Sequence, residues 1–176
     1  MEARASTTPE QAAKVRESWR IDPDVLEQRL VDNLAARGVD TSGLNWLSSE
    51  ETSSVVQRWM DSGAQRYGHL AFIPAVDSNV RRGEFDYGEL PTWLETDLRP
   101  REVFASFSHP AGGSRRIARS TFGFIVDNLV ALACADGDGF AMLTSDLGGI
   151  LLVNVPDSLD SRLEIDAWGD FVRELP

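Results

Sequence analysis

The first third of the chain has apolar residues at helical spacing behind clear helix start signals. Residues 8–11 form a capping-box pattern with Pro at the first helical position, which predicts a helix that begins at Pro9 and has Ala12, Val15 and Trp19 at helical spacing. Asp22-Pro23 predicts the start of a second helix, which ends near Gly38, and residues 48–51 predict a third. The apolar faces of the second and third helices comprise Leu26, Leu30, Leu34, Val55, Val56, Trp59 and Met60.

The middle third has a weaker pattern. Residues 69–76 are apolar and predict a short strand at a sheet edge, since Pro74 cannot donate a ladder hydrogen bond. Residues 78–88 contain Arg81-Arg82-Gly83 and predict a loop. We expect a short helix from Pro91, a strand over residues 102–108, and a break over residues 109–114.

The last third alternates between apolar runs and turns. Ser120 is the expected N-cap of a helix that ends before residues 136–139. Two apolar runs, at residues 140–143 and 150–155, flank a short Asp/Gly turn and predict a β-hairpin that is covered on both faces. Residues 162–168 alternate strictly, which predicts a half-exposed outer strand.

This order of elements predicts one α+β domain. Helices come first and strands later, without a repeated βαβ rhythm, so we expect N-terminal helices followed by a mixed or antiparallel sheet with a C-terminal β-hairpin and outer strand. Residues 1–7 are expected to be flexible, and residues 8–176 to form the single domain.

Composition narrows the class of protein. The net charge of −11 argues against nucleic acid as a partner, because a phosphate backbone would be repelled. The polar N-terminus and the lack of a long apolar run predict neither a signal peptide nor a membrane anchor. The cationic residues are Arg with the single exception of Lys14, as is common in proteins of GC-rich bacteria, and we expect a bacterial cytoplasmic protein.

No catalytic, metal or cofactor motif is recognisable. Residues 136–139 resemble the start of a calcium loop, but Phe140, Ala141 and Leu147 occupy positions that need a ligand, glycine and glutamate. Cys134 follows a predicted helix and precedes aspartates, a setting that favours a buried structural thiol over a nucleophile paired with histidine. We therefore expect no metal and no cofactor, although a catalytic site assembled from distant residues stays open.

One stretch of the chain is locally basic. A glycine loop followed by arginines can hold a phosphate or carboxylate through backbone N–H groups and guanidinium groups. The alternative is a surface loop with solvated arginines. The candidate anion-binding residues are His109, Ser114, Arg115, Arg116 and Arg119.

The strongest feature is the acidity of the C-terminal end. From residue 134 onward the sequence has nine acidic residues and two arginines, which gives this part a net charge of −7. An acidic face with aromatic anchors suits the docking of a basic protein, because charge steers encounter and aromatic side chains provide binding energy. The alternative is a solvated sheet face. The candidate partner-binding residues are Asp157, Asp160, Glu164, Asp166, Trp168 and Asp170.

In its size, its charge and the acidic end from Asp136 to Asp170, the chain loosely resembles the immunity proteins of bacterial toxin systems. The resemblance rests on no diagnostic motif and assigns no residue a role. It implies a non-catalytic protein that binds a basic partner such as a toxin, with its acidic C-terminal face as the contact. Two alternatives remain: a small-ligand or anion-binding module, which could be an enzyme, at the Gly-Gly-Ser-Arg-Arg loop, and an accessory subunit of a larger enzyme.

Overall fold

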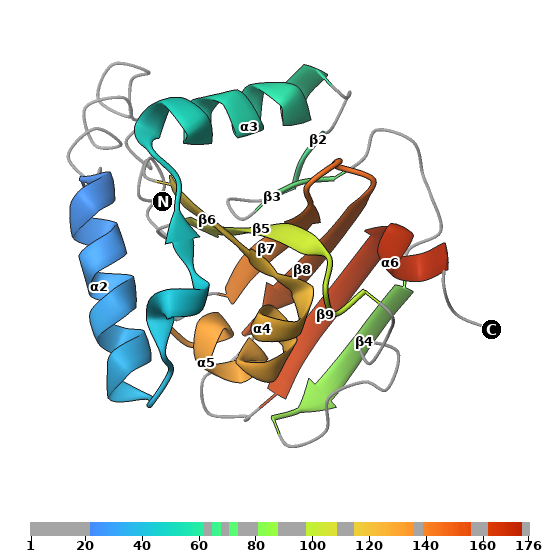
Figure 1. Ribbon diagram of the computed structural model, residues 1–176. Helices are drawn as coiled ribbons and strands as arrows, with labels where there is room; N and C mark the ends of the chain where they lie inside the picture. Colours follow the sequence, from blue (N-terminus) through green and yellow to red (C-terminus); the bar gives the residue numbers. More distant parts are fainter. Residues whose placement is uncertain are drawn as a thin grey trace, which may run out of the picture.

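Figure 1 shows a computed structural model of the chain, which describes residues 22–61, 65–67, 71–73, 81–87, 98–108, 115–135, 139–155 and 162–173. Several sequence predictions lie outside these residues. They are the flexible segment at residues 1–7, the helix that begins at Pro9, the short helix from Pro91 and the break at residues 109–114.

The two predicted helices in the described N-terminal part are confirmed. Helix α2 spans Pro23–Ala36, and the Asp22 side chain caps it by accepting a hydrogen bond from the Asp24 N–H. Helix α3 spans Ser49–Asp61 and begins with the expected capping box. Ser48 N–H donates to the Glu51 carboxylate at 2.9 Å, and Glu51 N–H donates to Ser48 Oγ at 3.2 Å. A 3-10 turn, η1 (Thr41–Gly43), lies between the two helices.

A seven-stranded antiparallel sheet forms the centre of the molecule, with strand order β1-β6-β5-β7-β8-β9-β4. Helices first and an antiparallel sheet afterwards confirm the α+β class. A separate hairpin pairs β2 with β3. The strands are β1 (Asn45–Trp46), β2 (Gln65–Tyr67), β3 (Ala71–Ile73), β4 (Arg81–Asp86), β5 (Glu102–Ser108), β6 (Arg115–Thr121), β7 (Gly139–Thr144), β8 (Gly149–Asn154) and β9 (Arg162–Gly169).

The predicted β-hairpin is confirmed as β7 and β8, which lie in the middle of the sheet. Every residue of β7 is buried, and so is β8 from Gly149 to Val153. Both faces of the hairpin are therefore covered, as the apolar residues on its two sides require.

Two expectations about the end of the sheet were wrong. Residues 81–86, expected in a loop, form strand β4, which pairs with β9 over its full length. Strand β9 is therefore not the outer strand, because β4 lies beyond it. The local sequence did not predict β4, because its charged residues alternate with Gly83 and Phe85 rather than with a regular apolar series. Pairing with β9 makes this segment extended.

The helical segment after β6 also differs from expectation. Ser120 is not the N-cap, because it belongs to β6, where its hydroxyl donates to the Gly43 carbonyl at 2.7 Å. Thr121 caps instead by accepting from Phe124 N–H. The segment is divided at Asn128 into helices α4 (Phe122–Asp127) and α5 (Leu129–Ala133). A short C-terminal helix, α6 (Asp170–Arg173), follows β9 directly.

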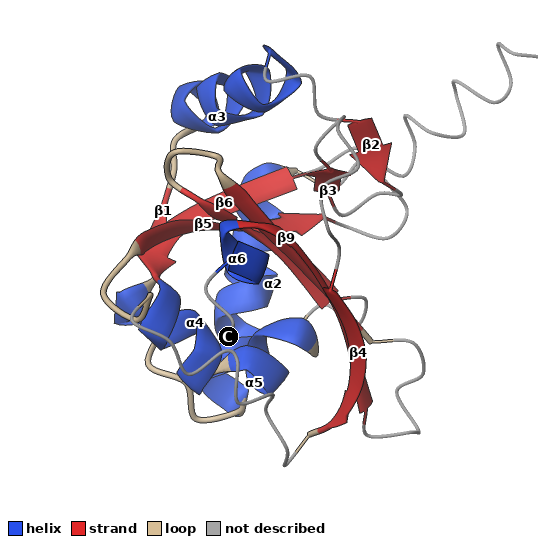
Figure 2. Ribbon diagram, turned by 90° about the vertical axis from the view of Figure 1, so that its right-hand side faces the viewer, coloured by secondary structure: helices blue, strands red, loops and turns tan. Residues whose placement is uncertain are grey.

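The sheet separates two apolar cores, one on each face. Helices α2, α4 and α5 cover one face, and α3 lies across the other together with the β2–β3 hairpin (Figure 2). The larger core joins the helices of the first face to the sheet. The smaller core, on the α3 face, consists of Leu47, Val55, Trp59, Phe104, Ile117, Ala141, Leu143, Ile150, Leu152 and Trp168. No described helix combines the length and the apolar character that crossing a membrane requires.

Candidate functional site

The α3 face of the sheet changes from apolar to charged where it reaches β9 and β4. Three residue pairs lie opposite each other on these strands: Arg82 and Asp166, Glu84 and Glu164, and Asp86 and Arg162. Asp166 is also the register partner of Leu152, which belongs to the core under α3. Because alternate residues of a strand share a face, all six charged residues lie on the α3 side. We call these six residues the charged strip.

Opposite charges pair at both ends of the charged strip. The Arg82 guanidinium lies 3.1 Å from the Asp166 carboxylate. At the other end, Arg162 lies 3.3 Å from Asp86 and 3.8 Å from Glu84. Five of the six charged residues therefore take part in cross-strand ion pairs, which favour this register of β4 against β9.

Like charges meet at the centre of the charged strip. Glu84 and Glu164 are direct register partners, and like charges in this arrangement destabilise a sheet. Glu84 has Arg162 nearby, whereas Glu164 forms no ion pair among the described residues. The centre of the strip therefore holds a carboxylate whose charge is not neutralised within the described part of the protein.

Asp166 is a largely enclosed carboxylate of the charged strip, with its side chain 14% exposed. Burial raises the pKa of Asp166, and the attraction of Arg82 offsets that rise only in part. The ion pair therefore does not fully compensate the loss of hydration at this carboxylate.

A groove of about 490 Å³ opens over this part of the sheet. Its described lining residues are Arg82, Gly83, Glu84, Glu164 and Asp166, which carry three negative charges and one positive charge. The absent side chain at Gly83 leaves room for the Phe85 ring, since a Cβ there would lie 2.5 Å from it. A groove with this charge suits a cationic group, such as the guanidinium or ammonium of a basic side chain.

The residues that line the groove include two predicted partner-binding residues and two charged residues that were not predicted from the sequence. Glu164 and Asp166 were expected at such a site, and both line the groove. Arg82 and Glu84 were missed because their segment was expected to be a loop. The alternating charges from Arg82 to Asp86 were the available signal. Asp157 and Asp160 lie outside the described residues.

Trp168 does not fulfil its expected role as an exposed aromatic anchor. Its side chain shares the α3 face with Asp166, but the residue is only 5% exposed and belongs to the core under α3. Phe171 is buried on the other face, where its ring stacks on Phe122 at 5.6 Å. The described acidic face therefore presents charge, while these two aromatic residues stabilise the fold.

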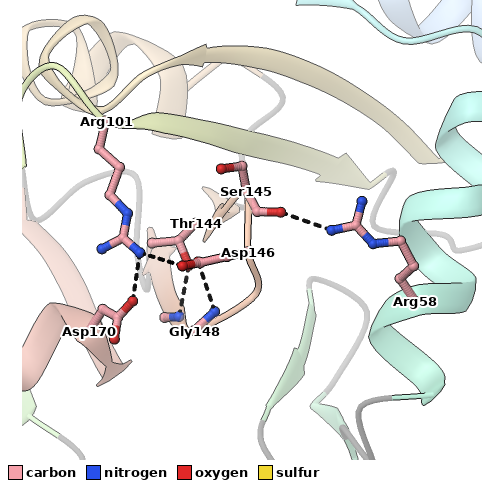
Figure 3. A network of polar contacts seen from close by, with 8 residues as sticks. Arg58, Arg101, Thr144, Ser145, Asp146, Gly148 and Asp170 are labelled. Carbon is pink, nitrogen blue, oxygen red and sulfur yellow. Dashed lines mark hydrogen bonds and ion pairs between the residues drawn. The ribbon is translucent and has the colours of Figure 1, made fainter.

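Asp170 is not among the described lining residues of the groove and takes part in a polar network instead. Its carboxylate accepts a hydrogen bond from Arg101 at 2.8 Å, and Arg101 also binds Asp146 at 2.8 Å (Figure 3). Arg58 of α3 donates to the Ser145 carbonyl in the same network. These contacts connect the β7–β8 turn with α3, the start of β5 and α6, so Asp170 contributes to holding that end of the sheet together.

Of the candidate anion-binding arginines, Arg116 and Arg119 do not come together. Arg116 was predicted as a possible anion-binding residue; it is only 7% exposed and forms an ion pair with Glu27 of α2, which leaves its guanidinium little access to an external anion. Arg119 lies on the opposite face of β6, near Glu102 and over the Phe104 ring. The side chain of Arg115 and all of His109 and Ser114 lie outside the described structure.

Cys134 and the acidic residues form no recognisable metal centre in the described part of the chain. Cys134 is partly exposed rather than fully buried, and its thiol donates to the Tyr87 hydroxyl at 3.4 Å. This hydrogen bond and burial raise the pKa of Tyr87 to about 12. The pair connects the end of β4 to the end of α5.

Comparison with known proteins adds no assignment to this geometry. No protein-family model, curated protein or solved structure matches the chain. The acidic groove over β4 and β9 is therefore the feature on which a functional proposal rests.

Proposed function

We propose that this protein is a non-catalytic binding protein of the immunity or antitoxin kind, which engages a basic partner protein through the groove at β4 and β9. The observation that supports the proposal most directly is Glu164. It lines the groove opposite Glu84 and has no ion-pair partner among the described residues. A cationic side chain from a partner could bind both glutamates at once and would supply the counter-charge that Glu164 lacks among the described residues.

The electrostatics of the whole chain favour the same kind of partner. A net charge of −11 attracts basic proteins at long range, and the groove offers a short-range destination for a cation. The proposed contact is the charged strip rather than an aromatic anchor, since Trp168 is only 5% exposed. We propose that this encounter takes place in the bacterial cytoplasm.

The proposal is tested by affinity purification from the native host with the tagged full-length protein. The test variant is Glu84→Gln/Glu164→Gln, which removes two charges at the groove. Its matched control, Asp32→Asn/Glu102→Gln, removes two charges from exposed acidic residues on α2 and β5. We expect a basic protein to be recovered with the wild-type and control proteins and to be reduced at least about tenfold with the groove variant.

The same partner then serves for kinetics at two salt concentrations. We expect the groove variant to associate more slowly than the control and to show a weaker dependence on salt. Equal recovery and equal association rates for both variants would contradict the proposed site, and recovery of an acidic partner would contradict the proposed class of partner.

A further inference from the structure

Strand β4 ends the sheet. In the described part of the chain it pairs with β9 and with no other strand, whereas β9 has neighbours on both sides. The opposite edge strand, β1, has only two residues, while β4 has six consecutive residues in regular register. A long regular edge strand has backbone N–H and C=O groups that can pair with a further strand.

The side chains of β4 restrict which strand can pair there. Arg82, Glu84 and Asp86 lie on the α3 face, whereas Gly83 and Phe85 lie on the face of the larger core. Charges on an edge strand discourage indiscriminate pairing, and this pattern of one positive and two negative charges opposes any strand that lacks complementary charges. The charges that discourage indiscriminate pairing at this edge can therefore also select a partner strand with complementary charges.

The added strand would also reach the groove. Neighbouring strands lie about 4.8 Å apart, so an arginine opposite Glu84 on an added strand can extend across Glu84 to Glu164. The like-charge pair at the centre of the charged strip would then have a cation beside it. Edge pairing and neutralisation of the groove are thus compatible in one bound segment.

We infer that β4 is a docking edge for an extended segment of a basic partner, which adds an antiparallel strand to the sheet and delivers a cationic side chain to Glu84 and Glu164. This inference rests on the proposed function and specifies its mode of binding. The antiparallel direction follows the rest of the sheet. On the added strand we expect a basic residue opposite Glu84, another basic residue opposite Asp86 and an acidic residue opposite Arg82.

The test uses the full-length protein and the peptide acetyl-Thr-Arg-Val-Arg-Val-Asp-Thr-amide, which has this charge pattern in antiparallel order. Binding is measured by NMR titration, with amide hydrogen exchange of β4 as a second measurement. We expect shifts centred on residues 82–86 and slower exchange of alternate β4 amides. A charge-reversed peptide, acetyl-Thr-Asp-Val-Asp-Val-Arg-Thr-amide, should bind at least about tenfold more weakly.

Two N-methylated forms of the first peptide separate strand pairing from simple charge attraction. Alternate amides of a strand point to opposite edges, so methylation of one alternate set should block pairing with β4 and methylation of the other should not. We expect about a tenfold or greater loss of affinity for one form and less than about a threefold loss for the other.

The outcomes distinguish the inference from the proposed function. Equal binding of both methylated peptides would overturn strand addition, while loss of binding in Glu84→Gln/Glu164→Gln would still support the acidic groove. Absence of binding by the parent peptide would also overturn strand addition, and the proposed function would then depend on the partner recovered from the host. Shifts confined to another surface would overturn the assigned edge.

Discussion

Glu84 and Glu164 lie directly opposite each other on β4 and β9, with ion pairs on either side of them along the two strands. A like-charge pair at this position lowers the stability of the free protein, and the groove beside it gives access to a neutralising cation. A functional site that is slightly unfavourable until it is occupied is a common feature of binding proteins.

Replacing one of these glutamates should stabilise the free protein. For Glu164→Gln we expect the free energy of unfolding to rise by about 0.5 kcal/mol at low ionic strength, because the repulsion from Glu84 is removed. In 0.5 M NaCl the gain should largely disappear through screening. Urea denaturation at both salt concentrations measures the effect. Glu102→Gln is the control, and a gain of the same size there would contradict a local cause.

Asp166 and Asp146 should show opposite dependences on pH. The folded pKa of Asp166 is raised by burial, so its protonated form favours the folded state. That contribution is present below its ordinary value of 3.8 and is lost as pH rises through the raised folded value. Asp166→Asn should therefore be neutral or stabilising at pH 7, and its advantage over the wild type should shrink below pH 4. Thermal unfolding between pH 3 and pH 7 provides the measurement.

The pKa of Asp146 is shifted in the opposite direction to that of Asp166. Its pKa is lowered by a hydrogen bond from the Thr144 hydroxyl, by the Gly148 N–H and by Arg101. Its stabilising contribution is present above its ordinary value of 3.8 and is lost as pH falls through the lower folded value. Asp146→Asn should therefore destabilise at pH 7 and converge on the wild type in acid. Parallel pH profiles for the two variants would refute this contrast.

The ion pair between Arg116 and Glu27 should be costly to break from one side. Arg116 is buried beneath α2, so Glu27→Gln or Arg116→Met leaves a charge without its partner. We expect Glu27→Gln, which leaves the buried Arg116 guanidinium without this carboxylate, to lower the free energy of unfolding by about 3 kcal/mol. Arg116→Met should cost less, because the Glu27 side chain that it leaves is 27% exposed, and Glu27→Leu/Arg116→Met should recover most of the loss. Arg119→Met, at a largely exposed pair 3.8 Å from Glu102, should cost less than about 1 kcal/mol. Chemical denaturation of the four variants decides between these outcomes.

Two buried serines should respond differently to the same substitution. Ser106 is 0% exposed, and its hydroxyl makes no hydrogen bond in the described structure, so Ser106→Ala should be neutral or stabilising. Ser120 donates to the Gly43 carbonyl, so Ser120→Ala should cost about 1 kcal/mol. A cost of that size for Ser106→Ala, measured by thermal unfolding, would reveal a bonded partner for that hydroxyl.

Local signals were sufficient where an element depends on its own residues. The Ser48–Glu51 capping box and the leucines of α2 identified their helices, and the two apolar runs identified the β7–β8 hairpin. In each case the informative residues lie within a few positions of one another, so local geometry and side-chain burial act on the same short segment.

Only the part of the candidate site that lies on β9 was predictable, because only that strand has a clear local pattern. Glu164 and Asp166 belong to a strand with clear alternation, whereas Arg82 and Glu84 belong to a segment that becomes a strand only through pairing with β9, some eighty residues further along the chain. The burial of Trp168 and Arg116 could not be predicted from local sequence, because the elements that bury them, α3 and α2, come from distant parts of the chain.

The sequence by itself therefore determined the class of fold, the described helices α2 and α3, the central hairpin and the acidity of the C-terminal end, because these follow from periodicity, capping and composition. Only the tertiary structure decided which acidic residues face one another, which aromatic and basic residues are buried, and which strand lies at the edge. The physical reason is that burial and cross-strand pairing are set by contacts between segments that no local pattern records.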